Sequence, residues 1–542
     1  MKTKISALLS LLLAFTVFFS ACSGKKEEEK KETATGKKQV LNLIESSEIP
    51  SMDSTLATDA VSFSVMNNVM EGLYTLGEGD KPVPGVAESY EASEDGKTYT
   101  FKLRKDAKWS NGDPVTANDF VYSWKRAVDP ATAAEYAYIM FDVKNAQKIN
   151  NKEVSVDELG VKATDDYTLE VELETPVPYF LSLTSFPTFY PLNEKYIKEQ
   201  GDKFGLEANT TIYNGPFVLS EWKHEQSFQL KKNENYWDKG TVKLEEINYN
   251  IVKDVATGVN LYDTGDVDRT SLSAEFVDKY KSSPDFKTML EPTLFFLRLN
   301  EKNKFLGNVN IRKAISMSFD KEGIANVILN NGSMGAYGLV PQDFVQGPDK
   351  KDFRKNNGKL AKTDVNEAQA MWETGKKELG VDTVDLELLN FDSESAKKIG
   401  EYLKEQMEKN LPGLSVTIKQ QPFAQKLDLE SKGDYAMSFA GWGPDYPDPM
   451  TFLDMFVTGG SHNQMAYSNA KYDELIEKAK TDMSDLQARW DNLLEAEKIL
   501  FDDAAIAPVY QRGAAYVQKD YVKGVLEHSF GGDFSFKWAY IE

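Results

Sequence analysis

The sequence has 542 residues and a formal net charge of −22 at pH 7, with 63 basic and 85 acidic side chains. This acidic balance argues against nucleic acid as a partner, because phosphate binding requires a basic surface. A single cysteine excludes a disulfide within the chain. The three histidines, His224, His462 and His528, are too far apart in the sequence to match a metal-binding motif. The length exceeds what one hydrophobic core supports, so we expect more than one lobe.

The first 38 residues predict a targeting segment followed by a tether. Two lysines precede a nearly continuous apolar run, residues 5–19, and small residues then lead to the only cysteine, Cys22. This order is typical of a secretory signal peptide, because the apolar run is too short for a membrane span and a charged tract follows it directly. We expect residues 1–21 to be a signal peptide and residues 22–38 to be a charged, disordered tether.

The small residues before Cys22 resemble the bacterial lipobox, although Phe19 occupies a position where that pattern prefers Leu. The resemblance implies that Cys22 becomes the lipidated first residue of the mature protein. Two acyl chains suffice to hold a soluble domain on a membrane. The alternative is an ordinary secreted protein with a spare thiol.

From residue 39 onward, segments of alternating polarity are interleaved with segments of helical spacing, which predicts an α/β fold. We expect the first helix to end at Gly72 and the second to begin with Asn118 as its N-cap. The expected strands are residues 40–44, 97–103, 168–173, 248–252, 294–299, 386–389 and 414–419. The expected helices are residues 62–73, 118–127, 309–318, 366–379, 395–410 and 486–501.

One stretch has the composition of a binding loop at the end of a strand. Residues 434–440 predict a short buried strand, and residues 450–456 predict a helical segment. Between them, residues 441–449 contain three prolines and two glycines, which argues against a continued strand. In an open α/β sheet, ligands usually bind just beyond the carboxyl ends of the strands.

That loop places Trp442 between Gly441 and Gly443, so a ligand could approach the backbone closely, and it places Asp445 three residues further on. The alternative is a rigid turn in which the tryptophan is core and the acid caps the next helix. Asp448, between two prolines, is expected to be a solvated turn residue or a helix cap.

Enzyme chemistry has little support in the sequence. It contains no Gly-x-Ser-x-Gly motif and no cysteine other than the one expected to carry lipid. Close pairs of carboxylates occur by chance among 85 acidic residues and favour no particular reaction. We expect a protein without catalytic residues, bound metal or cofactor.

Several long motifs extend over nearly all of the mature chain and end at the Trp442 loop. They are residues 87–90, 96–104, 107–112, 115–124, 214–217, 235–237 and 309–315. Together these motifs resemble family 5 of the extracellular solute-binding proteins, most closely the oligopeptide-binding proteins of bacterial ABC importers.

The resemblance implies a two-lobed, class II periplasmic-binding-protein fold with an additional subdomain. The base lobe would comprise residues 38–72, 195–300 and 510–542. The additional subdomain would be residues 73–194, and the second lobe residues 301–509. The chain crossings near Asn300 and Tyr510 would form the hinge.

The resemblance also implies a peptide-binding site. Asp445 would pair with the α-ammonium group of the ligand, since an amine in a dry cleft needs a charged partner. Backbone groups would pair with the peptide main chain as an added strand. For every position except Asp445 the alternative is framework packing. The other implied contacts are the backbone of Glu48, Ile49, Gly441 and Gly443, the hydroxyl of Tyr136, and the side-chain pocket walls Trp442 and Phe423.

The sequence departs from the enteric members of this family at two positions that neutralise the carboxylate of short peptides. Those positions correspond to Phe439 and Ala396. We therefore expect that these groups do not fix peptide length, and Arg512 near the hinge is a candidate substitute.

The implied function is that of a monomeric, lipid-anchored protein on the extracellular face of the cell membrane, or on the periplasmic side where an outer membrane exists. It would capture oligopeptides and deliver them to an ABC permease. Alternatives are a lipoprotein that presents a signalling peptide to a partner, and relatives of the same fold that bind nickel, haem or a sugar.

Overall fold

The computed structural model describes residues 37–481, 483 and 485–542. The predicted signal peptide, residues 1–21, and Cys22 lie outside these described residues. The chain divides into a unit Met1–Lys38 and a compact unit Gln39–Glu542. Within the described residues, no helix is both long enough and apolar enough to cross a membrane.

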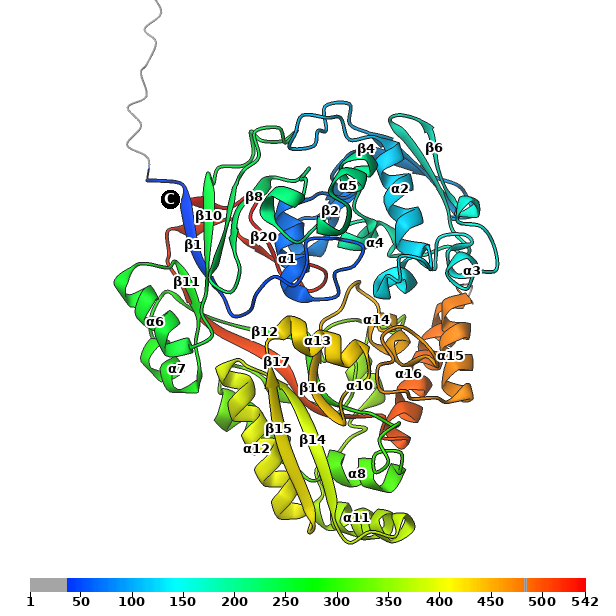
Figure 1. Ribbon diagram of the computed structural model, residues 1–542, viewed down its shortest axis with the longest axis vertical. Helices are drawn as coiled ribbons and strands as arrows, with labels where there is room; N and C mark the ends of the chain where they lie inside the picture. The colour runs from blue at the N-terminus through cyan, green and yellow to red at the C-terminus, as the bar shows by residue number, and fades with distance from the viewer. Residues whose placement is uncertain (1–36, 482, 484) are drawn as a thin grey trace, which may run out of the picture. The chain divides into compact units, whose positions relative to one another are not determined.

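The largest sheet has seven strands, and its long central strands run through the middle of the folded unit (Figure 1). β12 is antiparallel to both of its neighbours, β17 and β16, whereas β14 is parallel to β15 and β16. In spatial order the strands are β11 (Arg269–Ser271), β17 (Ile506–Gln518), β12 (Phe286–Leu299), β16 (Met437–Trp442), β14 (Val384–Phe391) and β15 (Leu414–Gln421), with β13 (Met334–Gly335) paired to β17.

Two four-stranded sheets and three two-stranded pairs complete the strands of the described residues. The first sheet is β1 (Val40–Glu45), β10 (Glu246–Ile251), β9 (Ser227–Lys232) and β8 (Phe217–Lys223). The second is β4 (Ala87–Ala92), β5 (Thr98–Leu103), β7 (Thr168–Glu172) and β6 (Val161–Asp165). The two-stranded pairs join β2 (Tyr74–Leu76) with β3 (Pro82–Pro84), β18 (Val522–Lys523) with β21 (Tyr540–Ile541), and β19 (Leu526–Glu527) with β20 (Phe534–Ser535).

Helices fill the connections between these strands. They are α1 (Ala60–Val69), α2 (Ala117–Val128), α3 (Ala146–Asn150), α4 (Phe180–Leu183), α5 (Glu194–Gln200), α6 (Val255–Thr264), α7 (Ala274–Tyr280), α8 (Val309–Met317), α9 (Lys321–Gly323), α10 (Phe353–Asn357), α11 (Val365–Leu379), α12 (Glu394–Asn410), α13 (Phe423–Ser431), α14 (Met450–Leu453), α15 (Ala470–Thr481) and α16 (Leu486–Asp502). Two short 3-10 helices, η2 (Glu135–Met140) and η8 (Asp454–Phe456), contribute to the site described below.

The expected α/β mixture is confirmed, and each expected strand and helix overlaps an observed one. Two helix ends were predicted wrongly. α1 ends before Gly72, where a β-carbon would lie 2.3 Å from the carbonyl oxygen of Thr184, so this glycine permits a close backbone approach rather than a helix end. α2 begins after Thr116 rather than at Asn118, because the carboxylate of Asp119 accepts hydrogen bonds from the Thr116 backbone and hydroxyl.

β12 and β17 pair with each other, and their further neighbours differ along their length. β17 also pairs with β11 over residues 516–518, and β12 also pairs with β16 over residues 294–299. The ladder between β12 and β17 is interrupted between Leu290 and Leu294, where Pro292 cannot donate a hydrogen bond. Two chain segments therefore cross side by side from one part of the sheet to the other.

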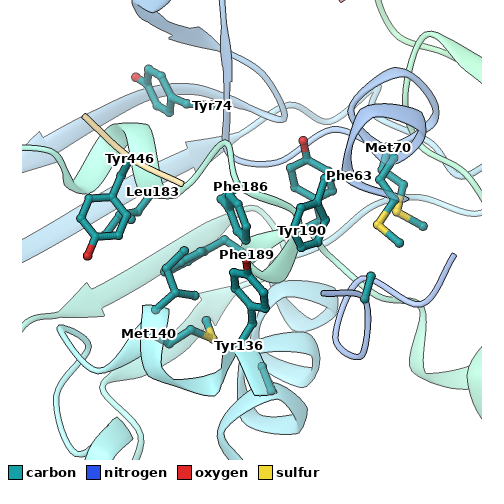
Figure 2. Close-up of a cluster of buried hydrophobic side chains, with 14 of the residues drawn as sticks. Phe63, Met70, Tyr74, Tyr136, Met140, Leu183, Phe186, Phe189, Tyr190 and Tyr446 are labelled. Carbon is teal, nitrogen blue, oxygen red and sulfur yellow. The ribbon is translucent and has the colours of Figure 1, made fainter. Parts of the chain in front are cut away.

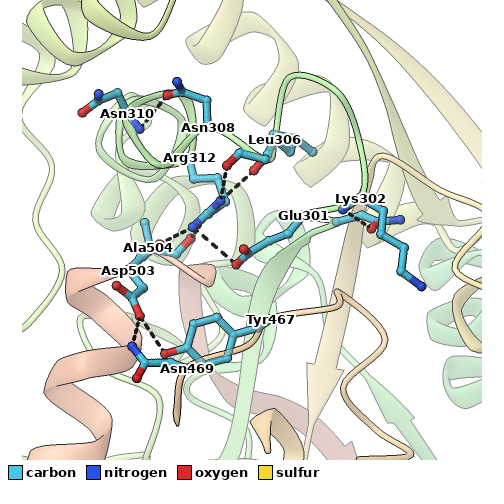
Figure 3. Close-up of polar contacts among 12 residues, drawn as sticks. Glu301, Lys302, Leu306, Asn308, Asn310, Arg312, Tyr467, Asn469, Asp503 and Ala504 are labelled. Carbon is cyan, nitrogen blue, oxygen red and sulfur yellow. Dashed lines mark hydrogen bonds and ion pairs between the residues drawn. The ribbon is translucent and has the colours of Figure 1, made fainter. Parts of the chain in front are cut away.

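The motif at residues 309–315 has a structural role. Arg312 on α8 is buried and donates to the carbonyl oxygens of Leu306 and Asp503, at 2.8 Å each, and it forms an ion pair with Glu301 (Figure 3). One side chain thus ties the start of α8 to the end of α16. The motif stabilises the fold and does not reach a ligand site.

Candidate ligand-binding site

A cavity of about 1530 Å³ lies among β12, β17, η2, α12, α13 and the segment that follows β1. Clefts for single small molecules are usually 300–1,000 Å³, so this cavity has room for a larger ligand. Six of the predicted contact residues line it: Gly441, Trp442, Gly443, Asp445, Tyr136 and Phe423.

The remaining two predicted residues, Glu48 and Ile49, do not line the cavity. Ile49 is buried in the core, and the carboxylate of Glu48 accepts hydrogen bonds from the Trp222 indole and the Glu225 backbone. The chain reaches the cavity slightly earlier, at residues 45–47.

The Trp442 loop begins later than the sequence predicted. β16 continues through Gly441 and Trp442, which pair with Phe295 and Leu294 of β12. A β-carbon at position 441 would lie 2.8 Å from the Phe295 ring, so this glycine makes room for a neighbouring side chain as well as exposing backbone to the cavity.

Trp442 forms part of a rigid aromatic wall. Its indole Nε1 donates to the Thr451 carbonyl oxygen at 2.9 Å, and its ring is nearly parallel to that of Tyr136, with centroids 6.3 Å apart. Tyr136 is itself held by Phe63 and Phe186, whose ring centroids lie 5.3 Å and 5.4 Å away (Figure 2). Core packing therefore fixes the groups that face the ligand.

Asp445 is the focus of this wall. It is only 5% exposed, and its backbone N–H donates to the Thr451 hydroxyl at 2.9 Å. Its two carboxylate oxygens accept hydrogen bonds from the hydroxyls of Tyr136 at 3.4 Å and Tyr138 at 3.2 Å. Among the described residues, no lysine, arginine or histidine lies within ion-pair distance of this carboxylate.

The electrostatic surroundings oppose ionisation of Asp445. Burial, followed by the nearby charge of Asp454, raises the pKa of this carboxyl well above its usual value, and the tyrosine hydroxyls offset this only in part. An ammonium group brought by a ligand would reverse the balance, since a buried carboxylate is stabilised by an opposite charge at hydrogen-bond distance. The arrangement is suited to binding a cation from the cavity.

Three residues of this wall were not predicted as contacts: Tyr138, Thr451 and His462. The ring of His462 contacts those of Tyr136, Tyr138 and Trp442 edge-on, at 4.8–5.0 Å between centroids. Burial and the charge of Arg298 lower the pKa of His462 to about 3, so this ring is neutral. The spacing of the two tyrosines in η2 was the only sequence signal for any of these three residues.

Asp448 is not a solvated turn residue, so that expectation is wrong. Both of its carboxylate oxygens accept hydrogen bonds from the guanidinium of Arg489, each at 2.8 Å, and both side chains are largely buried. It is not the cap residue of the next helix either, since Pro449 is the N-cap of α14, although one Asp448 oxygen accepts from the Met450 backbone at 2.9 Å. The two acids of the loop thus have opposite surroundings.

The two positions where the sequence departs from the enteric pattern, Phe439 and Ala396, line the cavity and present apolar side chains to it. Arg512 also lines the cavity, but its guanidinium is paired with Glu291. Within the described residues, no group of three or more His, Cys, Asp or Glu side chains is arranged to hold a metal ion.

The fold and the cavity define an α/β binding protein of the two-lobed periplasmic class. A model of the bacterial extracellular solute-binding proteins, family 5 middle region, matches residues 81–464. The chain belongs to this family.

The chain is similar to named relatives along almost its entire length. The dipeptide-binding protein DppE of Bacillus subtilis is 36% identical over 518 residues, which cover 95% of this chain and 94% of that protein. The substrate-binding domain of an oligopeptide ABC transporter from Bacillus anthracis matches with a TM-score of 0.92 at 55% identity. Listeria monocytogenes OppA bound to peptide matches with a TM-score of 0.91 at 46% identity. Each of these two structures covers 93% of this chain and 99% of its own.

Asp445 lacks a cation partner among the described residues, whereas Asp448 is paired with Arg489. Replacement of each acid by asparagine should therefore have opposite effects on the stability of the folded protein. Because the folded state raises the pKa of Asp445, the protein loses stability as pH rises above the ordinary aspartate value of about 4. Asp445→Asn removes that loss, so the variant without ligand should unfold at the same or a higher temperature than the parent at pH 7, with a difference that grows from pH 5 upward. Calorimetric unfolding at several pH values measures this.

The matched control is Asp448→Asn, which strands the guanidinium of Arg489 and should cost roughly 3–5 kcal/mol of stability. If both variants are destabilised alike, the carboxylate of Asp445 is a structural group of the folded protein.

Proposed function

We propose that this protein captures oligopeptides by their free amino terminus and delivers them to the permease of an ABC importer. The observation that carries this proposal is Asp445, a buried carboxyl at the wall of a large cavity without a cation of its own among the described residues. A charge-assisted hydrogen bond to the α-ammonium group is about twice as strong as a neutral one. The similarity to a dipeptide-binding protein and to an OppA structure bound to peptide supports the same ligand class.

Backbone groups supply the rest of the peptide contacts in this proposal. Gly441 and Gly443 expose main chain at the cavity wall, and residues 45–47 take the place expected for Glu48 and Ile49. Main-chain pairing gives affinity without reading side chains. Trp442 and Phe423 then form walls for the ligand side chains, with Tyr136 as a hydroxyl partner.

Capture requires the two lobes to move relative to each other, and we place the hinge where β12 and β17 cross. The base lobe is residues 38–72, 195–300 and 510–542, the additional subdomain is residues 73–194, and the second lobe is residues 301–509. The interruption of the ladder between Leu290 and Leu294 supports a flexible crossing there, six to ten residues before the Asn300 position inferred from the sequence.

We also propose that lipid on Cys22 anchors the protein to the outer face of the cell membrane, with the charged tether of residues 22–38 as a spacer. The order of residues in the first 22 positions supports this. The anchor keeps the captured peptide close to the permease.

Peptide capture is tested with the unit Gln39–Glu542. It should bind unmodified peptides of several residues in a one-to-one complex and return them intact, because the site holds the ligand and carries no proposed catalytic group. Calorimetry measures the stoichiometry, and native mass spectrometry identifies any co-purified ligand. Binding of a metal ion, haem or a sugar while all peptides fail would remove the peptide assignment, and fragments of the peptide would indicate an enzyme.

The anchor is tested with Cys22→Ser in the full chain. The variant should keep its signal peptide uncut or be released to the medium, while the folded unit keeps its unfolding temperature, because no disulfide is lost. Cell fractionation and thermal unfolding measure both parts. Detergent-requiring membrane association of a Cys22→Ser chain whose signal has been removed would contradict the proposal.

A further inference from the structure

Arg298 is a buried cation in the cavity wall, and two of its three guanidinium nitrogens have no hydrogen-bond partner among the described residues. It lies on β12, is 5% exposed and lines the cavity. Its Nε and Nη1 atoms are buried, and neither has an acceptor among the described residues. A buried polar group without a partner is costly, and more so when it is charged, so the placement of this side chain needs an explanation.

Arg298, Lys426 and Glu430 together form a buried cluster with a net positive charge. In the sheet Arg298 lies opposite Ser438, and its charge acts on the carboxylate of Glu430. That carboxylate is already bound by Lys426 Nζ at 2.7 Å and by the Ser438 hydroxyl at 2.6 Å. Two buried cations therefore share one carboxylate. Both cations help to hold the pKa of Glu430 below its usual value against the effect of burial.

The neutral His462 contributes no charge of either sign at this end of the cavity. Arg512, the other arginine considered for this role, has a carboxylate partner in Glu291. Arg269, a third arginine of the cavity wall, is paired with Glu527, so Arg298 is the arginine of this wall without a carboxylate at ion-pair distance among the described residues. Its guanidinium fork matches the geometry of a carboxylate better than an ammonium group does.

We propose that Arg298 binds a carboxylate of the ligand, so that the site selects peptides that carry an acidic group near their amino terminus. The inference rests on the proposed peptide function and adds a specificity-determining residue to it. The carboxylate is supplied either by an acidic side chain or by the carboxyl terminus of a short peptide, which present the same chemistry to a guanidinium.

The sheet register gives the spacing between the two ends of the site. Arg298 lies opposite Ser438, whereas Trp442, next to the Asp445 loop, lies opposite Leu294. Four residues of strand advance by about 13 Å. An extended peptide advances roughly 3.3–3.6 Å per residue. The acidic group that meets Arg298 therefore belongs to about the third to fifth residue of a ligand whose amine is at Asp445.

The experiment measures affinities by calorimetry for two peptide series with free amino termini. In the first series, amidated alanine pentapeptides carry one Glu or one Gln at positions 2–5. In the second, unsubstituted alanine peptides of three, four and five residues end in a free acid or an amide. The parent protein should favour Glu over Gln at one position, or acid over amide at one length, by at least about tenfold. The series that shows the preference identifies the source of the carboxylate.

Arg298→Gln should abolish this preference while it changes the affinity for neutral amidated peptides by less than about threefold. Arg298→Lys, which keeps the charge without the fork, should retain part of the preference and provides a second variant if the first fails to fold. Lys397→Gln is the matched control, because it removes an exposed cavity-lining cation and should leave the preference unchanged.

Three results would overturn the assignment. They are a parent protein without any acid preference, a preference that survives in both Arg298 variants, and an equal loss for acidic and neutral peptides in both variants, which would mark Arg298 as structural. Failure of the parent to bind any peptide, amidated ones included, would instead remove the proposed function on which this inference rests.

Discussion

The structure of the site depends on one buried carboxyl without a counter-charge among the described residues, that of Asp445. Burying an acid without a counter-charge is unfavourable, and the fold holds it in place with two tyrosine hydroxyls, a threonine and a tightly packed aromatic wall. In the proposed function this cost is recovered when the ligand supplies the missing positive charge, because the groups that orient the acid are already fixed. A site of this kind distinguishes a free amino terminus from a blocked one without reading any side chain.

The surrounding framework keeps that acid where the ligand can reach it. β12 supplies the ladder that carries Gly441 and Trp442 to the cavity edge, and the Asp448–Arg489 ion pair secures the turn that follows. The same strand carries Arg298, which lies about 13 Å along β12 from Leu294, the residue paired with Trp442. β12 thus carries Arg298 at one end of the proposed site and supports the strand that leads to Asp445 at the other. The distance between the two ends is set by the geometry of the central sheet.

Much of this organisation could be predicted from local sequence patterns, and the failures have physical reasons. Alternating polarity located the strands, but the end of β16 was placed too early because Gly441 reads as a break until its packing against Phe295 is known. Asp448 looked solvated between two prolines because Arg489 is 41 residues away in the chain. Arg298 and His462 gave no signal, since only the tertiary fold determines that one lacks an acceptor and the other joins the aromatic wall.

The most direct measurement is a cycle of peptide affinities that combines Asp445→Asn with acetylation of the peptide amino terminus. Each change alone should weaken binding by about 2–5 kcal/mol, because it leaves the other partner buried and unpaired. Both changes together should cost much less than the sum of the two, since neither charge is then stranded. If Asp445→Asn binds free and acetylated peptides as the parent does, the carboxylate of Asp445 is not the partner of the ligand amine.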